Sequence, residues 1–287
     1  MRILIVGHGV VGKNLEKELE VLHPDVIDKY KPEENKIEVP YGARYDIAFI
    51  CVDTPIRKEE HVLCDTSEVK NAIMENEAEI YVIKSTVSPG TTEQLRVKTG
   101  KRIIFSPEYY GGTQHCNNFR FDFTILGGER KACIEVIQAL QHVYDARHQF
   151  RITDSRTAEL TKYMENSFLA TKVSFCQQFY FIASEMDVDY EELRELFVLD
   201  PRVNPSHTFV DRLHPYWSSH CLDKDVPAIA DAYEASLLQE VIKFNENTKK
   251  CLGIIRRAET PEVIKNDMLM YQAGVRRKEI LKDRETP

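Results

Sequence analysis

Residues 220–225 place a cysteine, a lysine and two aspartates within one short stretch of the chain. The thiolate is the nucleophilic form of cysteine, and a nearby ammonium group stabilises it. Beside a redox cofactor, Cys221 near Lys224 could therefore act as the nucleophile of an oxidation. The structural alternative is a helix that carries Asp223 and Asp225 in its first turn, where carboxylates are favoured, with a half-buried cysteine above them. The other elements of the chain decide between these two interpretations.

The length and charge of the chain limit the classes of function. At 287 residues it is long enough for two domains, and its 43% hydrophobic and 29% charged residues are typical of a globular protein in water. The net charge of −8 and the lack of a long basic run argue against nucleic acid as a partner.

Seven cysteines stand at irregular positions with no CxxC pair, which suits a reducing compartment and predicts neither a disulfide framework nor a metal site. The first apolar run, residues 3–6, ends at a glycine, and no run has the length needed to span a bilayer. We therefore expect a cytoplasmic protein with no targeting signal and no membrane contact.

A glycine-rich turn follows the first apolar run. The order is a strand over residues 2–6, then a G-x-G-x-x-G turn, then a helix that carries apolar residues at helical spacing. In a dinucleotide-binding turn the first glycine makes the bend, the second lets the backbone approach a pyrophosphate, and the third lets the helix pack on the strand. The predicted cofactor contacts here are Gly7, Gly9, Val10, Val11 and Gly12.

An acid stands where such a fold needs one. The second strand, residues 25–28, ends at Asp28, which is 28 − 7 = 21 residues after Gly7 and could bind a ribose. Because its charge would repel a 2′-phosphate, we expect NAD rather than NADP. The positive charge of Lys29 beside it could instead attract that phosphate. The alternative is a plain glycine turn with an aspartate at a strand end.

Strands alternate with helices over the first half of the chain. Apolar runs at 46–52, 79–83, 102–105 and 121–126 alternate with helical patterns at 66–76, 91–98 and 129–143. This order predicts an α/β fold, with a doubly wound parallel sheet in a Rossmann NAD-binding domain over residues 1–152. Three loops at the strand ends, 53–55, 84–90 and 106–108, carry polar residues that either bind ligand or simply make turns.

From residue 153 the pattern is all-helical, and we expect a central domain over 153–287. A long helix over 154–186 carries Lys162 and Asn166 four residues apart, so they share a face and could hold an oxyanion or a hydroxyl, or else form a solvated pair. A second helix covers 190–197, and a third runs from about 223 through 247 towards 253. The last stretch, 260–287, is expected to form a polar helix with a frayed end.

These motifs occur in an order that resembles the UDP-glucose/GDP-mannose dehydrogenase family. The resemblance covers residues 1–250 and rests on the glycine turn and on five further blocks. These blocks are DIAFICVDTP at 46–55, KSTVSPGTT at 84–92, SPE at 106–108, AELTKYMENSFLATK at 158–172 and CLDKD at 221–225.

The resemblance implies the oxidation of a primary alcohol on a nucleotide-linked sugar, of the UDP-glucose type used in polysaccharide biosynthesis, to a carboxylate with two NAD. It implies that Cys221 captures the intermediate aldehyde, that Lys162 and Asn166 stabilise the oxyanion, that Asp225 and Thr86 position water and protons, and that Glu108 assists thioester hydrolysis. Such roles fit covalent and electrostatic catalysis.

The same likeness extends the set of predicted contacts and implies a homodimer built on the long helix. Arg202 resembles a family arginine that reaches the substrate of a neighbouring subunit. The remaining implied cofactor contacts are Lys29, Val52, Thr54, Pro55, Ser85, Thr86 and Glu108. The implied substrate contacts are Lys162, Asn166, Arg202, Tyr109 and Tyr110.

Three departures from the family pattern bear on substrate binding. The glycine-rich loop before the cysteine is replaced by the bulkier residues 216–220, and Asp223 stands in place of a proline, so we expect a reshaped sugar pocket. Gly112 replaces a second glutamate. The family's further nucleotide-binding domain would begin where the sequence ends, so much of the contact with UDP is expected to be missing.

Two other functions remain open at this stage. Hydroxyacid and phosphogluconate dehydrogenases also place a lysine and an asparagine four residues apart on a helix, which would mean a single hydride transfer that does not need Cys221. A non-catalytic binding or assembly protein that retains the dinucleotide fold is the third hypothesis.

Overall fold

The computed structural model describes residues 1–37, 44–56, 63–110 and 121–255. Contacts between Cα atoms divide the chain into two units, Met1–Met164 and Glu165–Pro287. This division lies within a helix, whereas the predicted domains meet at residues 152 and 153. The expected helix at 260–287 and Gly112 lie outside the described residues.

Unit 1 is built on a seven-stranded sheet with the strand order β2-β1-β3-β4-β5-β6-β7. All neighbouring strands run parallel except β5 and β6, which are antiparallel. The predicted α/β fold with a largely parallel sheet is therefore confirmed. The strands are β1 Ile3–Val6, β2 Asp25–Ile27, β3 Tyr45–Ile50, β4 Ala78–Ile83, β5 Ile103–Phe105, β6 Phe123–Gly127 and β7 Gln149–Thr153.

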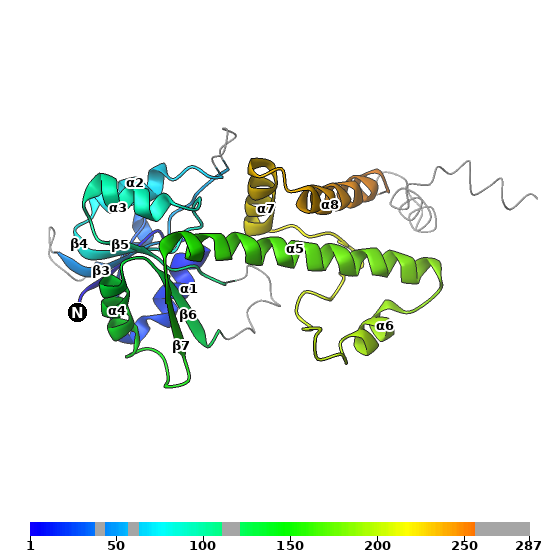
Figure 1. Ribbon diagram of the computed structural model, residues 1–287, viewed down its shortest axis with the longest axis horizontal. Helices are drawn as coiled ribbons and strands as arrows, with labels where there is room; N and C mark the ends of the chain where they lie inside the picture. The colour runs from blue at the N-terminus through cyan, green and yellow to red at the C-terminus, as the bar shows by residue number, and fades with distance from the viewer. Residues whose placement is uncertain (38–43, 57–62, 111–120, 256–287) are drawn as a thin grey trace, which may run out of the picture. The chain divides into compact units, whose positions relative to one another are not determined.

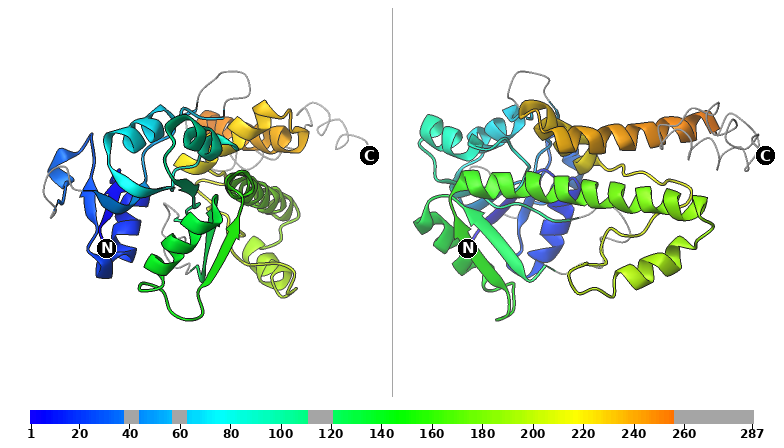
Figure 2. Two further views of the ribbon diagram at one scale, coloured as in Figure 1. Left: turned by 60° about the vertical axis from the view of Figure 1, so that its left-hand side comes forward. Right: turned by 45° about the vertical axis from the view of Figure 1, so that its right-hand side comes forward.

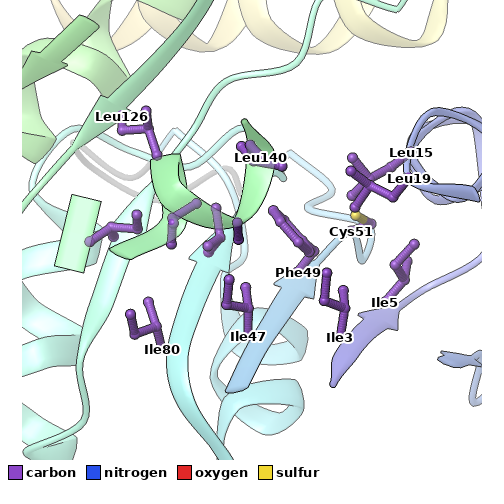
Figure 3. Close-up of a cluster of buried hydrophobic side chains, with 14 of the residues drawn as sticks. Ile3, Ile5, Leu15, Leu19, Ile47, Phe49, Cys51, Ile80, Leu126 and Leu140 are labelled. Carbon is purple, nitrogen blue, oxygen red and sulfur yellow. The ribbon is translucent and has the colours of Figure 1, made fainter. Parts of the chain in front are cut away.

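Helices cover both faces of this sheet because successive strand residues point to opposite sides. Figure 1 shows α1 and α4 on one face and α2 and α3 on the other. Ile3 and Ile5 belong to the cluster that α1 and α4 cover (Figure 3), whereas Leu4 and Val6 belong to the cluster under α2 and α3. The helices are α1 Val10–Glu18, α2 Ser67–Glu75, α3 Thr91–Thr99 and α4 Arg130–Leu140, with short 3₁₀ turns η1 Glu20–Leu22 and η2 Pro32–Glu34.

Strand β7 was not predicted. Only Phe150 and Ile152 of this strand pack into the core, while Gln149, Arg151 and Thr153 alternate with them. Among the described strands it lies at the end of the sheet and pairs with β6 alone. It therefore lacks the continuous apolar run that marks a central parallel strand.

The second half of the chain is helical among the residues described. Helix α5, Ser155–Glu185, runs without interruption from unit 1 into unit 2 (Figure 2, right). It is followed by α6 Tyr190–Phe197, α7 His220–Ala232 and α8 Ser236–Ile255. Among the described helices, none combines the length and the apolar character that a membrane crossing requires.

The prediction of one long helix from about 223 towards 253 is wrong in one respect, because the chain forms two helices there. Helix α7 ends at Ala232, and Glu234 adopts a left-handed conformation with φ 48°, which breaks the helical path before α8 begins. Helix α7 also begins three residues earlier than predicted. Ser219 is its N-cap and accepts a hydrogen bond from the Leu222 N–H, so Cys221 lies in the first turn.

Candidate functional site

The glycine turn has the close packing that the sequence predicts for a dinucleotide site. Gly7 has φ +97°, and a Cβ there would lie 2.6 Å from the Cys51 carbonyl oxygen. A Cβ on Gly12 would lie 2.0 Å from the Gly7 oxygen, so both positions require glycine. Gly9 differs, because a Cβ would meet nothing within 4 Å.

That open space lies at the N-terminus of α1, of which Gly9 is the N-cap. Val10, Val11 and Gly12 form the first turn, where backbone N–H groups and the helix dipole favour an anion. The turn therefore fits the pyrophosphate of a dinucleotide without displacement of a side chain.

Asp28 follows β2 and lies against this turn. One carboxylate oxygen accepts from the His8 backbone N–H at 2.7 Å, and the other accepts from the N–H groups of Tyr30 and Lys31. Burial alone would raise the pKa of Asp28, but these N–H donors outweigh it and hold that pKa below its usual value. The ammonium of Lys29 lies 3.7 Å from a Glu68 carboxylate oxygen, so its charge is partly balanced there.

Hydrogen bonds join the loops that follow β3 and β4. Thr54 donates its hydroxyl to the Thr86 carbonyl oxygen at 2.8 Å, and Ser85 donates its hydroxyl to the Val52 oxygen at 2.6 Å. The Pro55 oxygen accepts from the Asp65 N–H. Predicted residues from two loops thus lie side by side at the carboxyl edge of the sheet, which is where ligands bind in such folds.

Glu108 and Lys162 meet in the interior of unit 1, with only 5% and 4% of each residue exposed. A Glu108 oxygen lies 3.8 Å from the Lys162 ammonium, and the Tyr110 N–H donates to the Glu108 carboxylate at 2.7 Å. The Lys162 ammonium also lies 5.1 Å from the centre of the Tyr109 ring. Glu108, Tyr109 and Tyr110 line a cavity of about 940 Å³.

Asn166 and Asp225 form the corresponding buried pair in unit 2. The Asn166 amide donates to Asp225 Oδ2 at 2.6 Å, and Lys224 Nζ lies 2.6 Å from Asp225 Oδ1. Because Oδ1 makes no well-directed hydrogen bond, this second contact is an ion pair. Asp225 is fully buried, so its two neighbours offset the cost of burying a carboxylate.

Cys221 is half-buried and lies one helical turn before Asp225 on the same face of α7. The first turn was expected to contain both aspartates, but it contains Cys221 and Asp223, whereas Asp225 follows in the second turn. Lys224, which was expected to stabilise the thiolate, pairs its ammonium with Asp225. The N-terminal N–H groups of α7 also provide a favourable field for an anion at this position.

The bulky segment before α7 contributes its tryptophan to the interior of unit 2. Trp217 is buried in the core of unit 2 and donates its indole N–H to the Ser174 hydroxyl. Asn245 of α8 accepts from the Trp217 N–H and donates to the Trp217 oxygen. The tryptophan thus contributes to the core, where it fixes the chain that leads into α7.

Arg202 lies at the surface with 88% of its side chain exposed, and it pairs with Asp200 of the same loop at 2.6 Å.

Lys84 was not among the predicted site residues. It is buried and donates to the Ser106 hydroxyl and to the Pro107 oxygen. Burial lowers the pKa of Lys84. Its sequence signals were its place after an apolar run and at the start of the block 84–92.

Two sequence models of one protein family match this chain. They are the NAD binding domain of the UDP-glucose/GDP-mannose dehydrogenase family, which matches residues 16–147, and the central domain of the same family, which matches residues 156–247. Together they cover most of the described residues.

Similar curated proteins carry nucleotide-sugar dehydrogenase names. A UDP-N-acetyl-D-mannosamine dehydrogenase of Methanocaldococcus jannaschii is 25% identical over 78% of this chain and 52% of its own length. A UDP-glucose 6-dehydrogenase of Bacillus subtilis is 28% identical over 73% of this chain and 50% of its own length. The chain therefore spans about half the length of these relatives.

Among solved structures, a UDP-glucose dehydrogenase from Pyrobaculum islandicum matches with a TM-score of 0.70. The identity is 22%, and the match covers 87% of this chain and 69% of that one. At this identity the likeness supports the fold.

Proposed function

The chain belongs to the UDP-glucose/GDP-mannose dehydrogenase family, and from this premise we propose that it is an NAD-dependent nucleotide-sugar 6-dehydrogenase. The substrate is a sugar nucleotide in which UDP is the favoured nucleotide. The primary alcohol of the sugar is oxidised to a carboxylate. The observation that carries the proposal is the buried hydrogen bond between Asn166 of α5 and Asp225, which shares one face of α7 with Cys221.

The proposed reaction uses two oxidations and one hydrolysis. NAD bound at the glycine turn supplies the hydride acceptor for each oxidation. After the first, Cys221 Sγ adds to the aldehyde carbon and forms a thiohemiacetal, which loses a hydride to the second NAD and its hydroxyl proton to become a thioester. Water then adds to the thioester carbon and the C–S bond breaks, which yields the carboxylate and restores the Cys221 thiol.

The polar groups have separate tasks in this scheme. The Lys162 ammonium and the Asn166 amide stabilise the oxyanion, whose charge appears only during reaction. Asp225, held by Asn166 and Lys224, and Thr86 position water and take part in proton transfer. Glu108, which lies 3.8 Å from Lys162, assists thioester hydrolysis.

NAD consumption measured against a panel of sugar nucleotides tests this proposal. The full chain is incubated with NAD and with UDP-glucose, UDP-N-acetylmannosamine or GDP-mannose, and NADH is measured by its absorbance. We expect two NADH per molecule of one of these sugars. Cys221→Ala should lower the overall rate by about 10³-fold or more, while Cys133→Ala, at a buried cysteine of α4, should not.

Two results would count against the proposal. If folded, NAD-binding protein makes no NADH with any of these sugars, the sugar nucleotide assignment is wrong. If Cys221→Ala keeps full activity and only one NADH forms per substrate, a single hydride transfer without a covalent intermediate replaces it.

We also propose a homodimer that forms through α5. An exposed apolar stripe recurs at helical spacing along α5 and just past its end. It consists of Phe168 (63% exposed), Phe175 (49%), Phe179 (41%), Ile182 (38%) and Met186 (69%). A second copy of the chain would bury this stripe, because the same apolar face on each copy is self-complementary around a two-fold axis. Arg202 would reach the substrate of the neighbouring subunit in this arrangement.

A further inference from the structure

His8 stands inside the glycine turn, between Gly7 and Gly9, yet its side chain is buried. Its Nδ1 lies 2.6 Å from a Glu34 carboxylate oxygen, and its Nε2 lies 2.8 Å from a Glu16 carboxylate oxygen. A neutral imidazole has one N–H and one lone pair, so one of these contacts would set a lone pair against a carboxylate. The charged ring has an N–H for each carboxylate, and the geometry therefore fits an imidazolium.

Both carboxylates around His8 have a second cationic partner. Burial would raise the pKa of Glu16, but hydrogen bonds from Lys36 and His8 hold it below its usual value. Hydrogen bonds from Lys13 and His8 likewise lower the pKa of Glu34. With His8 protonated, positive and negative groups alternate through the cluster. Its charged members are Lys13 and Glu16 from α1, His8 from the turn, and Lys31, Glu34 and Lys36 from the segment after β2.

This cluster connects the glycine turn to the segment that begins at Asp28. The His8 backbone N–H donates to Asp28, and the His8 ring binds Glu34 of η2. Between these two points, Asp28 accepts from the N–H groups of Tyr30 and Lys31. One residue thus holds both ends of the segment 28–34 against the turn that fits the pyrophosphate.

We propose that protonated His8 is a positioning residue for NAD, which fixes the segment 28–34 on the glycine turn by bridging Glu16 and Glu34. This inference concerns NAD binding alone and does not depend on the sugar oxidation. Loss of this bridge leaves the segment held less firmly, so NAD binding must order that segment and the Kd for NAD rises.

Calorimetric titration of the full chain with NAD tests the proposal. We expect His8→Gln to raise the Kd for NAD roughly tenfold, which is within the usual range for two coupled sites, because one amide cannot donate to two carboxylates on opposite sides. Glu34→Gln weakens the same bridge and should raise the Kd as well. The double variant should raise the Kd no further than His8→Gln alone, because both changes remove one bridge.

Glu93→Gln is the matched control, since Glu93 lies on α3 and, among the described residues, pairs with Arg96 in its own helix turn. It should keep the wild-type Kd. The proposal is overturned if the wild type binds no NAD, or if both His8→Gln and Glu34→Gln keep the wild-type Kd. If His8→Gln does not fold, nitrogen-15 NMR of wild-type His8 decides, because a neutral ring at pH 6 contradicts the proposal and two protonated ring nitrogens support it.

Discussion

At the scale of single residues, burial separates the cysteines of the described ranges into two kinds. Burial raises the pKa of Cys51 to about 12 and that of Cys133 to about 11, so both remain thiols near neutral pH. Cys221 is half-buried and lies in the first turn of α7. Its accessibility and the helix N-terminus both favour reaction at this position.

Thiol labelling should reflect this difference. At pH 8 only about 1 in 10⁴ of the Cys51 side chains carries a thiolate, because the pH lies about four units below its pKa. Iodoacetamide should therefore modify Cys221 at least roughly 100-fold faster than Cys51 or Cys133, as measured by peptide mass spectrometry on native protein. Cys116 lies outside the described residues and is replaced by serine for the measurement. Equal rates at the three sites would contradict the assignment of Cys221 as the reactive thiol.

At the scale of elements, Glu159 of α5 holds the start of α3. Its carboxylate accepts from the Gly90 N–H at 2.5 Å and from the Thr92 N–H at 2.8 Å, and it is fully buried. Gly90 is the N-cap of α3 and has φ +100°, which disfavours other residues. Because α3 directly follows the loop 84–90, Glu159 ties that loop to the helix that carries Lys162 one turn later.

Removal of this carboxylate should leave two N–H groups without their acceptor. We expect Glu159→Ala to lower the free energy of unfolding by about 3 kcal/mol, measured in urea. Glu93→Ala, at an exposed pair, should leave the free energy of unfolding nearly unchanged. Equal losses in the two variants would show that Glu159 does not cap α3.

The pH dependence of the Glu159 effect has a defined sign. Burial raises the pKa of Glu159 above its usual value of about 4.5, so the folded protein holds this proton more tightly than the unfolded chain. The resulting stabilisation is complete below that usual value and is lost as the pH rises through the raised pKa. The difference between wild type and Glu159→Ala should therefore be larger at pH 5 than at pH 8.

At the scale of the whole molecule, the apolar stripe of α5 bears on assembly. The Phe175 ring lies 4.9 Å from that of Phe179 on the same helix and 6.3 Å from that of Phe197 on α6. These aromatic side chains retain exposed area, which is the usual mark of a protein interface.

Charge placed on this stripe should prevent association. The double variant Phe175→Glu, Phe179→Glu should be monomeric at about 10 µM in sedimentation velocity, where we expect the wild type to be a dimer, since two desolvated carboxylates per chain cost several kcal/mol. Leu237→Glu, at an exposed position of α8, is the matched control and should remain dimeric. A wild type that sediments as a monomer, or a double variant that remains a dimer, would contradict the interface.

The sequence by itself determined the features whose causes are local. Apolar runs, the spacing of Gly7, Gly9 and Gly12, and helical periodicity predicted β1 to β6 and the helices of unit 1 with small errors at their ends. These signals depend on neighbouring residues, because side-chain period and turn conformation are set within a few positions. They were weaker where an element lies at the edge of the sheet, as with β7, or where one left-handed residue, Glu234, interrupts a helical pattern.

The residues of the candidate site were found largely through the resemblance, since spacing alone left their roles open. Only the tertiary structure decided that Asn166 binds Asp225, that Lys224 pairs with that same carboxylate, and that Trp217 belongs to the core of unit 2. The partners in the His8 cluster are also distant in the sequence. Such contacts depend on how whole elements pack, and no local pattern specifies which distant charges are buried together.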